Sequence, residues 1–333
     1  MTTPTEQLAE GLTKIAAHHF GGATITDLKR LSGGASQETW SFKAHKDGEA
    51  EALILRRAPG GGDGNASGTA VGLETEAKLI QLAADAGVVV PTVRYVALAA
   101  DGLGSGFIMN HVHGETLGSK IVRNDEFANV RPKLARQCGE ALAKLHAVPV
   151  KSLPPLRVSP AVEEIARYRE VYKTHGHPHP VFDLAFKWLS DNLPADDRQT
   201  LVHGDFRNGN IMFDATDGVS AILDWELAHV GDPMEDMGWI CVNSWRFGGI
   251  NKPVGGFGDR EEMFASYEAS GGPKVDPDRV KFWEVLGTLK WGVMCTTMYE
   301  AFKSGMDRSV ERAAIGRRSS ETEIDLLYLL AAD

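Results

Sequence analysis

The order of two hydrophobic periodicities constrains this chain more than any other feature. Short alternating segments broken by glycine, such as 40–43 and 52–56, fall in the first third and predict strands of an antiparallel sheet. From about Leu117 onward apolar residues recur at helical spacing, as in 132–148. Strands first and helices later indicate an α+β fold, not repeated βαβ units. We predict a two-lobed fold, with a smaller antiparallel-sheet lobe over residues 1–110 and a larger, mainly helical lobe over residues 111–333.

The same patterns predict individual elements. Further strands are expected at 88–91, 93–98 and 107–112, and brief apolar strands at 201–203 and 221–223. Further helices are expected at 5–20, 73–86, 161–175 and 182–192, with helices and glycine breaks from residue 235 onward.

Composition excludes several classes of function. The chain has 35 Lys and Arg against 45 Asp and Glu, a formal charge of −10, which argues against a nucleic-acid binder and against an electrostatic membrane anchor. No segment approaches the roughly 20 apolar residues of a membrane span, and the N-terminus lacks a secretory signal. The three cysteines show neither zinc spacing nor a disulfide framework. We therefore expect a cytoplasmic protein; the sequence does not report its oligomeric state.

Two neighbouring segments carry the candidate chemistry. The first, 203–210, reads HGDFRNGN, and the second, 222–226, reads ILDWE. They supply Asp205, then Asn210 five positions later, then Asp224 fourteen positions beyond Asn210. Phosphoryl transfer requires one carboxylate to orient the attacking hydroxyl and accept its proton, and hard oxygen ligands to hold Mg²⁺ against nucleotide phosphates. Asp205 fits the first role, and Asn210 and Asp224 fit the second.

The spacing also predicts how these residues meet. Apolar residues 211–213 follow Asn210 and lead into a turn at 214–218. A hairpin built on that turn brings Asn210 and Asp224 together.

These segments resemble the aminoglycoside phosphotransferase and choline kinase family, which has a protein-kinase-like fold. Its catalytic loop has the form H-x-D-x-x-x-x-N, followed by an I-x-D metal motif, and this chain matches at His203, Asp205, Asn210 and Asp224. The resemblance implies that Asp205 is the catalytic base and that Asn210 and Asp224 ligate Mg²⁺. It implies ATP as the phosphoryl donor, with GTP left open. His203 and Asp236 are expected to support the loop and not to react.

The resemblance also places the nucleotide. A glycine-rich turn containing Gly33, Gly34, Ala35 and Ser36 is expected over the ATP phosphates, because small residues let backbone N–H groups approach anionic oxygens. The alternative is a plain hairpin. Arg56 takes the position of the strand cation that contacts the phosphates; Arg57 is its competitor, since alternation lets one of the two face the cleft.

Two more nucleotide-side features follow from the resemblance. Glu76 is expected to pair with the strand cation, with Glu74 as the competitor and a solvated carboxylate at the helix N-terminus as the plain alternative. The backbone of Asn110, His111 and Val112 is expected to form the hinge that bonds the adenine edge.

The function expected from these features is ATP- and Mg-dependent transfer of a phosphoryl group to a hydroxyl of a small molecule. Three acceptor classes stay open: aminoglycoside-like, choline-like and hydroxyacyl-CoA-like. The last follows from a similarity to a subfamily related to phosphotransferases fused to acyl-CoA dehydrogenases. The alternative function is a catalytically idle nucleotide-binding module; a protein kinase is disfavoured because no D-F-G or A-P-E segment is recognisable.

Overall fold

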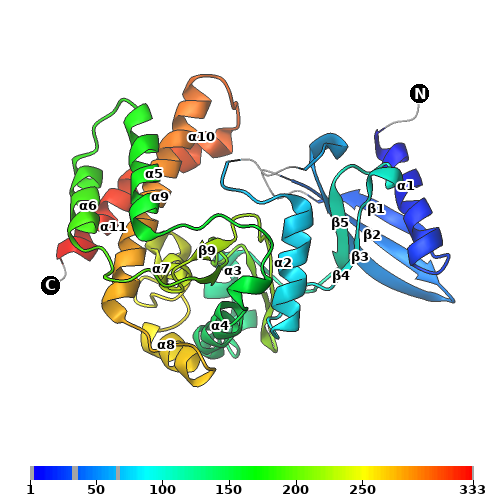
Figure 1. Ribbon diagram of the computed structural model, residues 1–333, viewed down its shortest axis with the longest axis horizontal. Coiled ribbons are helices and arrows are strands. Elements are labelled where there is room, and N and C mark those ends of the chain that lie inside the picture. Colours follow the sequence, from blue (N-terminus) through cyan, green and yellow to red (C-terminus); the bar gives the residue numbers. More distant parts are fainter. Residues whose placement is uncertain (1–3, 32–36, 65–67, 332–333) are drawn as a thin grey trace.

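A sheet forms one end of the molecule and helices fill the other in the computed structural model, which describes residues 4–31, 37–64 and 68–331 (Figure 1). The sheet is antiparallel, in the order β1-β2-β3-β5-β4. Its strands are β1 (Thr24–Arg30), β2 (Glu38–Lys46), β3 (Glu49–Arg57), β4 (Val93–Val96) and β5 (Gly106–Asn110). The predicted α+β, kinase-like architecture is confirmed.

Two helices accompany the sheet and belong to different cores. Helix α1 (Pro4–His19) packs Leu8 and Leu12 with Trp40 and the alternating apolar residues of β2 and β3. Helix α2 (Leu73–Asp85) instead places its buried face in the large core that continues through the helical part. Because α2 is shared in this way, the apolar packing does not divide at residue 110, and a lobe boundary there stays a prediction.

The remainder of the chain is mainly helical and is organised around α9 (Pro277–Lys303) (Figure 1). Helix α9 begins where the Asp276 side chain accepts the N–H groups of Asp278 and Arg279, with Pro277 at the first helical position. The other helices are α3 (Gly118–Arg123), α4 (Arg131–His146), α5 (Ala161–Thr174), α6 (Pro180–Asp191), α7 (Met234–Cys241), α8 (Arg260–Ala269), α10 (Val310–Gly316) and α11 (Ser319–Ala331).

Two small sheets lie within this helical part. Strand β6 (Thr200–Val202) pairs with β9 (His229–Gly231), and β7 (Ile211–Asp214) pairs with β8 (Gly218–Ile222). The brief strands predicted at 201–203 and 221–223 correspond to β6 and β8 with shifted bounds. The loops that leave these strands carry the motif residues.

The strand predicted at 88–91 is wrong. The Val88 N–H donates to the carbonyl of Ala83 and closes the end of α2, while the Val89 carbonyl accepts from Ile222. Pro91 has no N–H to donate. The hydrogen bonds of this segment therefore go to the end of a helix and to a distant strand, and β4 begins only at Val93.

No helix in the described part of the chain is long and apolar enough to cross a membrane.

Candidate active site

Helix α7 holds the start of the loop that runs from His203 to Asn210. The buried Asp236 carboxylate accepts the backbone N–H groups of His203 and Gly204, each at 2.9 Å. Burial alone would raise the pKa of Asp236, but its hydrogen bond with His146 holds the pKa below the ordinary value. Gly204 has a φ of 79°, and a Cβ there would lie 2.6 Å from the Leu227 carbonyl oxygen, so only glycine fits.

His203 supports the loop through both of its ring nitrogens. The Asp205 N–H donates to His203 Nδ1 at 3.2 Å, so the ring proton lies on Nε2, where the Leu223 carbonyl accepts it at 3.0 Å. The ring is buried against Trp225, 4.9 Å between centroids. His203 therefore ties the Asp205 loop to the segment that carries Asp224.

Three side chains hold the Asp205 carboxylate. Arg207 donates from Nε to Oδ1 at 2.9 Å and from a terminal nitrogen to Oδ2 at 3.1 Å. The Trp239 indole N–H donates to Oδ1 at 2.7 Å, and the Asn210 amide donates to Oδ2 at 2.6 Å. The Asp205 side chain is 16 % exposed, so it is held in place yet reachable from solvent.

The β7–β8 hairpin brings Asn210 and Asp224 to the same place. Ile211 pairs with Ile222, and the Leu223 N–H donates to the Asn210 carbonyl at 2.7 Å. The predicted hairpin is confirmed. Asp224 then adopts a φ of 62°, a region where a non-glycine residue is under strain and which is common at functional sites.

Arg56 links the sheet to this hairpin. Its Nε lies 3.0 Å from Glu76 Oε1, and one terminal nitrogen donates to both Asp224 and Glu226, the latter at 3.2 Å. Arg57 points to the opposite face of β3, where it pairs with Glu38 at 2.9 Å. Of the two competing cations, Arg56 is therefore the one beside Asp224.

The competing glutamates separate in the same way. Glu76 is buried and reaches both Arg56 and the backbone N–H of Trp225, whereas Glu74 is exposed. Burial, reinforced by Asp224 and Glu226 and opposed by Arg56, raises the pKa of Glu76 to about 7.

The charge around Arg56 bears on metal binding. Three carboxylates, Glu76, Asp224 and Glu226, face one guanidinium, so the ionised cluster carries surplus negative charge. Among the described residues no group of three His, Cys, Asp or Glu side chains is arranged to hold a metal by itself. An Asn–Asp pair that completes its shell with phosphate oxygens and water suits Mg²⁺, and the surplus charge suits a dication.

The predicted hinge lies at the end of β5. The N–H groups of Asn110 and His111 donate to the carbonyls of Thr92 and Ala52, both at 3.0 Å, so these two donors are used inside the lobe. A contact of this segment with adenine therefore depends on its carbonyls and on Val112. Burial and the neighbouring His113 lower the pKa of His111. The predicted turn residues Gly33, Gly34, Ala35 and Ser36 lie outside the described residues.

Sequence reasoning missed three residues of the site. Glu226 stands two positions after Asp224, and both carboxylates reach Arg56 from the same short segment. Arg207 stands inside the loop motif itself. Trp239 lies one turn of α7 after Asp236, and that spacing is the signal that could have placed it at the loop.

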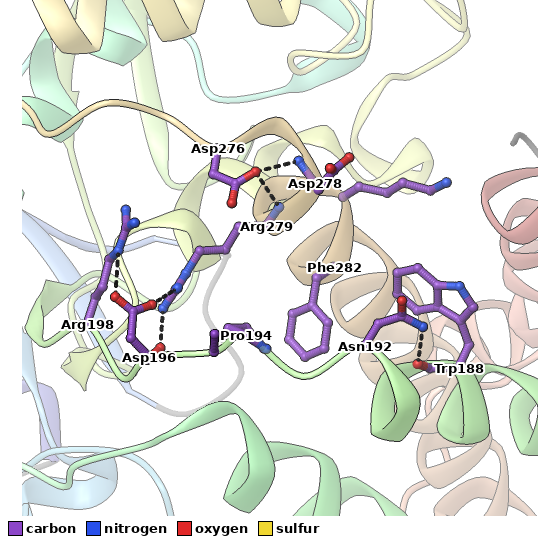
Figure 2. Close-up of a pocket in the computed structure, with 11 residues that line it drawn as sticks. Trp188, Asn192, Pro194, Asp196, Arg198, Asp276, Asp278, Arg279 and Phe282 are labelled. Atoms are coloured by element: carbon purple, nitrogen blue, oxygen red, sulfur yellow. Dashed lines mark hydrogen bonds and ion pairs between the residues drawn. The ribbon is translucent and has the colours of Figure 1, made fainter.

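A cavity of about 400 Å³ lies elsewhere, between the end of α6 and the start of α9. Trp188 and Phe282 are among the residues that line it (Figure 2). Arg279 lines it and pairs with Asp196, as Figure 2 shows. Arg279 also pairs with Asp232, which does not line the cavity. None of the predicted site residues lines this cavity, so the candidate chemistry is not located there.

Fold and loop geometry together define a kinase-like phosphotransferase. The family model described as "Phosphotransferase enzyme family" matches residues 27–283, and the chain belongs to this family.

Curated relatives carry a different name. "Acyl-CoA dehydrogenase family member 10" of Mus musculus is 26 % identical over 73 % of this chain, and "Acyl-CoA dehydrogenase family member 11" of Rattus norvegicus is 30 % identical over 71 %. The chain spans 22 % and 30 % of their respective lengths.

Solved structures show the same fold. A Ralstonia eutropha protein assigned as an aminoglycoside phosphotransferase has a TM-score of 0.77 at 22 % identity, covering 97 % of this chain and 98 % of that one. A choline/ethanolamine kinase family protein from Mesorhizobium loti has a TM-score of 0.61 at 20 % identity, covering 98 % and 95 %. Spectinomycin phosphotransferase APH(9)-Ia, solved with ADP and spectinomycin, has a TM-score of 0.60 at 16 % identity, covering 95 % and 97 %.

Proposed function

We propose that this chain transfers the terminal phosphoryl group of ATP, as its Mg²⁺ complex, to a hydroxyl of a small molecule. The observation that carries the proposal is the meeting of Asp205, Asn210 and Asp224 around one loop and one hairpin. Family membership supports phosphotransfer, and a neighbour of the same fold was solved with ADP. GTP is the alternative donor.

The reaction assigns each loop residue a task. Asp205 orients the acceptor hydroxyl and takes its proton at a carboxylate oxygen as the hydroxyl oxygen bonds to the γ-phosphorus; the bond from that phosphorus to the β-bridging oxygen breaks, and ADP leaves. Asn210 and Asp224 would hold Mg²⁺, which neutralises phosphate charge when bound. Asp236 and His203 keep Asp205 in position.

The nucleotide side is proposed on the sheet lobe. Arg56, oriented by Glu76, neutralises phosphate charge, and the backbone around Val112 meets the adenine edge. The site thus takes residues from both ends of the molecule, which meet where Arg56 of β3 donates to Asp224 after the β7–β8 hairpin.

The acceptor is a small hydroxyl compound in this proposal. Aminoglycoside-like, choline-like and hydroxyacyl-CoA-like compounds are the candidate classes, the last supported by the names of the curated relatives. The alternative function, a nucleotide-binding module without turnover, predicts binding without transfer.

Calorimetry of Mg²⁺-dependent ATP and GTP binding tests the nucleotide half of the proposal. The wild type should bind ATP only with Mg²⁺, and Asp224→Ala should lose this Mg²⁺-dependent binding. Asp217→Ala removes an exposed carboxylate of the same hairpin and should bind as the wild type does. Absence of binding of either nucleotide to the wild type would remove the basis for the proposed function.

A further inference from the structure

The Asp205 carboxylate has no free acceptor position. Oδ1 accepts from Arg207 and Trp239, and Oδ2 accepts from Arg207 and Asn210. A carboxylate offers about four lone-pair sites, and four donors fill them here. An acceptor hydroxyl can donate to Asp205 only after one of these donors has moved away.

Arg207 is the donor that can leave. Asn210 and Trp239 are 7 % and 4 % exposed, whereas the Arg207 side chain is 26 % exposed. Its guanidinium lies over the face of Trp245, 4.5 Å from the ring centroid, with a further bond to the Asn208 carbonyl.

The chain's own cations cover the aromatic faces next to Asp205. Arg207 covers Trp245, and the buried Lys290 ammonium lies 4.5 Å from the ring centroid of Trp239. Lys290 also faces Glu235, Glu164 and Asp205, and it donates to the Gly204 carbonyl at 3.3 Å. Arg157 and Arg167 pair with Glu164, and His229 contacts Glu235. A quaternary ammonium would need such a face for itself, so these tryptophans do not form a cage for choline.

We propose that Arg207 acts as a latch: its guanidinium occupies the Asp205 carboxylate until an oxyanion binds the guanidinium in place of Asp205. We further propose that this oxyanion belongs to the acceptor. The inference rests on the proposed function and narrows it to acceptors that carry a carboxylate or phosphate beside the reacting hydroxyl. Guanidinium and oxyanion pair through two parallel hydrogen bonds, the geometry that Arg207 now gives to Asp205. The same chemistry is present in the γ-phosphoryl group, so the test separates the two sources.

The first arm measures ATP hydrolysis with Mg²⁺ and no acceptor. In this reaction water bonds to the γ-phosphorus, its proton goes to Asp205, and ADP leaves. Arg207→Gln frees two of the four positions on Asp205, and we expect hydrolysis to rise on the order of tenfold, the scale of one charged hydrogen bond. Arg207→Lys, which keeps the charge without the fork, should lie between the variant and the wild type.

The second arm compares the affinity of the imido analogue of ATP with that of ADP, each with Mg²⁺. If the acceptor opens the latch, Arg207→Gln keeps the preference of the wild type between these nucleotides. If hydrolysis does not rise and the preference is lost, Arg207 binds the γ-phosphoryl group, and the assignment of the oxyanion to the acceptor is overturned. Arg136→Gln, an exposed arginine paired with Glu140 on α4, is the matched control and should change neither reading.

Two further outcomes are distinct. Hydrolysis that does not rise in Arg207→Gln, together with an unchanged nucleotide preference, overturns the latch and leaves the proposed function in place. A wild type that binds neither nucleotide overturns the proposed function, and the latch with it.

Discussion

At the scale of the residue, the buried carboxylates of the site differ in the partners that hold them. Asp205 has Arg207, and Asp236 has His146 and two backbone donors. Arg56 faces three carboxylates at once, Glu76, Asp224 and Glu226, and burial raises the pKa of the most deeply buried of them, Glu76.

Glu76 makes stability depend on pH. Unfolded, its carboxyl loses its proton near pH 4.5, and folded near pH 7. Between these values the folded state holds a proton that the unfolded chain has released, so the stability this group contributes is full below pH 4.5 and is lost as pH rises to 7. Glu76→Gln does not titrate, so its free energy of unfolding relative to the wild type should rise over that window by up to about 3 kcal/mol.

Denaturant unfolding at a series of pH values measures this difference. Glu74→Gln, at an exposed position in the same helix turn, should show no such trend. A flat difference for Glu76→Gln would contradict the raised pKa.

Asp236 should contribute strongly to the stability of the fold. Asp236→Ala leaves the buried N–H groups of His203 and Gly204 without an acceptor, which should cost about 3–5 kcal/mol of unfolding free energy. Asp236→Asn keeps one acceptor oxygen and should fall between that variant and the wild type. Chemical denaturation gives the order, and an alanine variant as stable as the wild type would contradict the anchoring role.

At the scale of the element, α7 positions the loop from His203 to Asn210 because it supplies both Asp236 and Trp239. Gly238 lies between them and faces α9, where an added Cβ would meet the Glu284 N atom at 2.6 Å and Trp283 Cβ at 2.7 Å. The close contact between α7 and α9 therefore fixes the position of α7, and with it the position of the loop that Asp236 holds.

Gly238→Ala should push the two helices apart. We expect a loss of about 1–3 kcal/mol of unfolding free energy, the usual cost of overpacking, and lower turnover because Trp239 moves relative to Asp205. Gly62→Ala, where the added Cβ meets only ordinary contacts, is the control. Thermal unfolding combined with phosphotransfer rates tests this, and a fully active, stable Gly238→Ala would show that α7 tolerates displacement.

Elements were predictable from the sequence where local pattern and tertiary use agree. The β7–β8 hairpin follows from an apolar run and a turn, and strand alternation separates the faces of Arg56 and Arg57. The strand at 88–91 failed because α2 and β8 take its hydrogen bonds. The convergence of Arg56 on Glu226, 170 positions away, and the filling of Asp205 by Arg207 and Trp239 depend on side-chain directions that no local pattern encodes.

At the scale of the whole molecule, the candidate site joins the sheet to the helical part. Arg56 and Glu76 come from one side and Asp224 and Glu226 from the other, and the Val71 N–H donates to the Glu226 carbonyl. A ligand held between these groups stabilises both parts at once.

Tryptophan fluorescence can separate the two parts, because Trp40 is the only tryptophan before residue 111 and the other six follow residue 187. Mg·ATP should raise the melting temperature reported by Trp40, taken as wild type minus Trp40→Phe, and by the remaining tryptophans together. A shift seen by only one set of probes would place the nucleotide within one part and not between them.

The most direct test of the central claim is transfer of the radiolabelled γ-phosphoryl group of ATP to a panel of hydroxyl compounds, with and without an anionic group, by the wild type and by Asp205→Asn. The account predicts a labelled product with the wild type and a rate lower by orders of magnitude with the variant, which should keep its fold and its Mg²⁺-dependent ATP binding. Near-normal transfer by Asp205→Asn would contradict the assignment of Asp205 as the base.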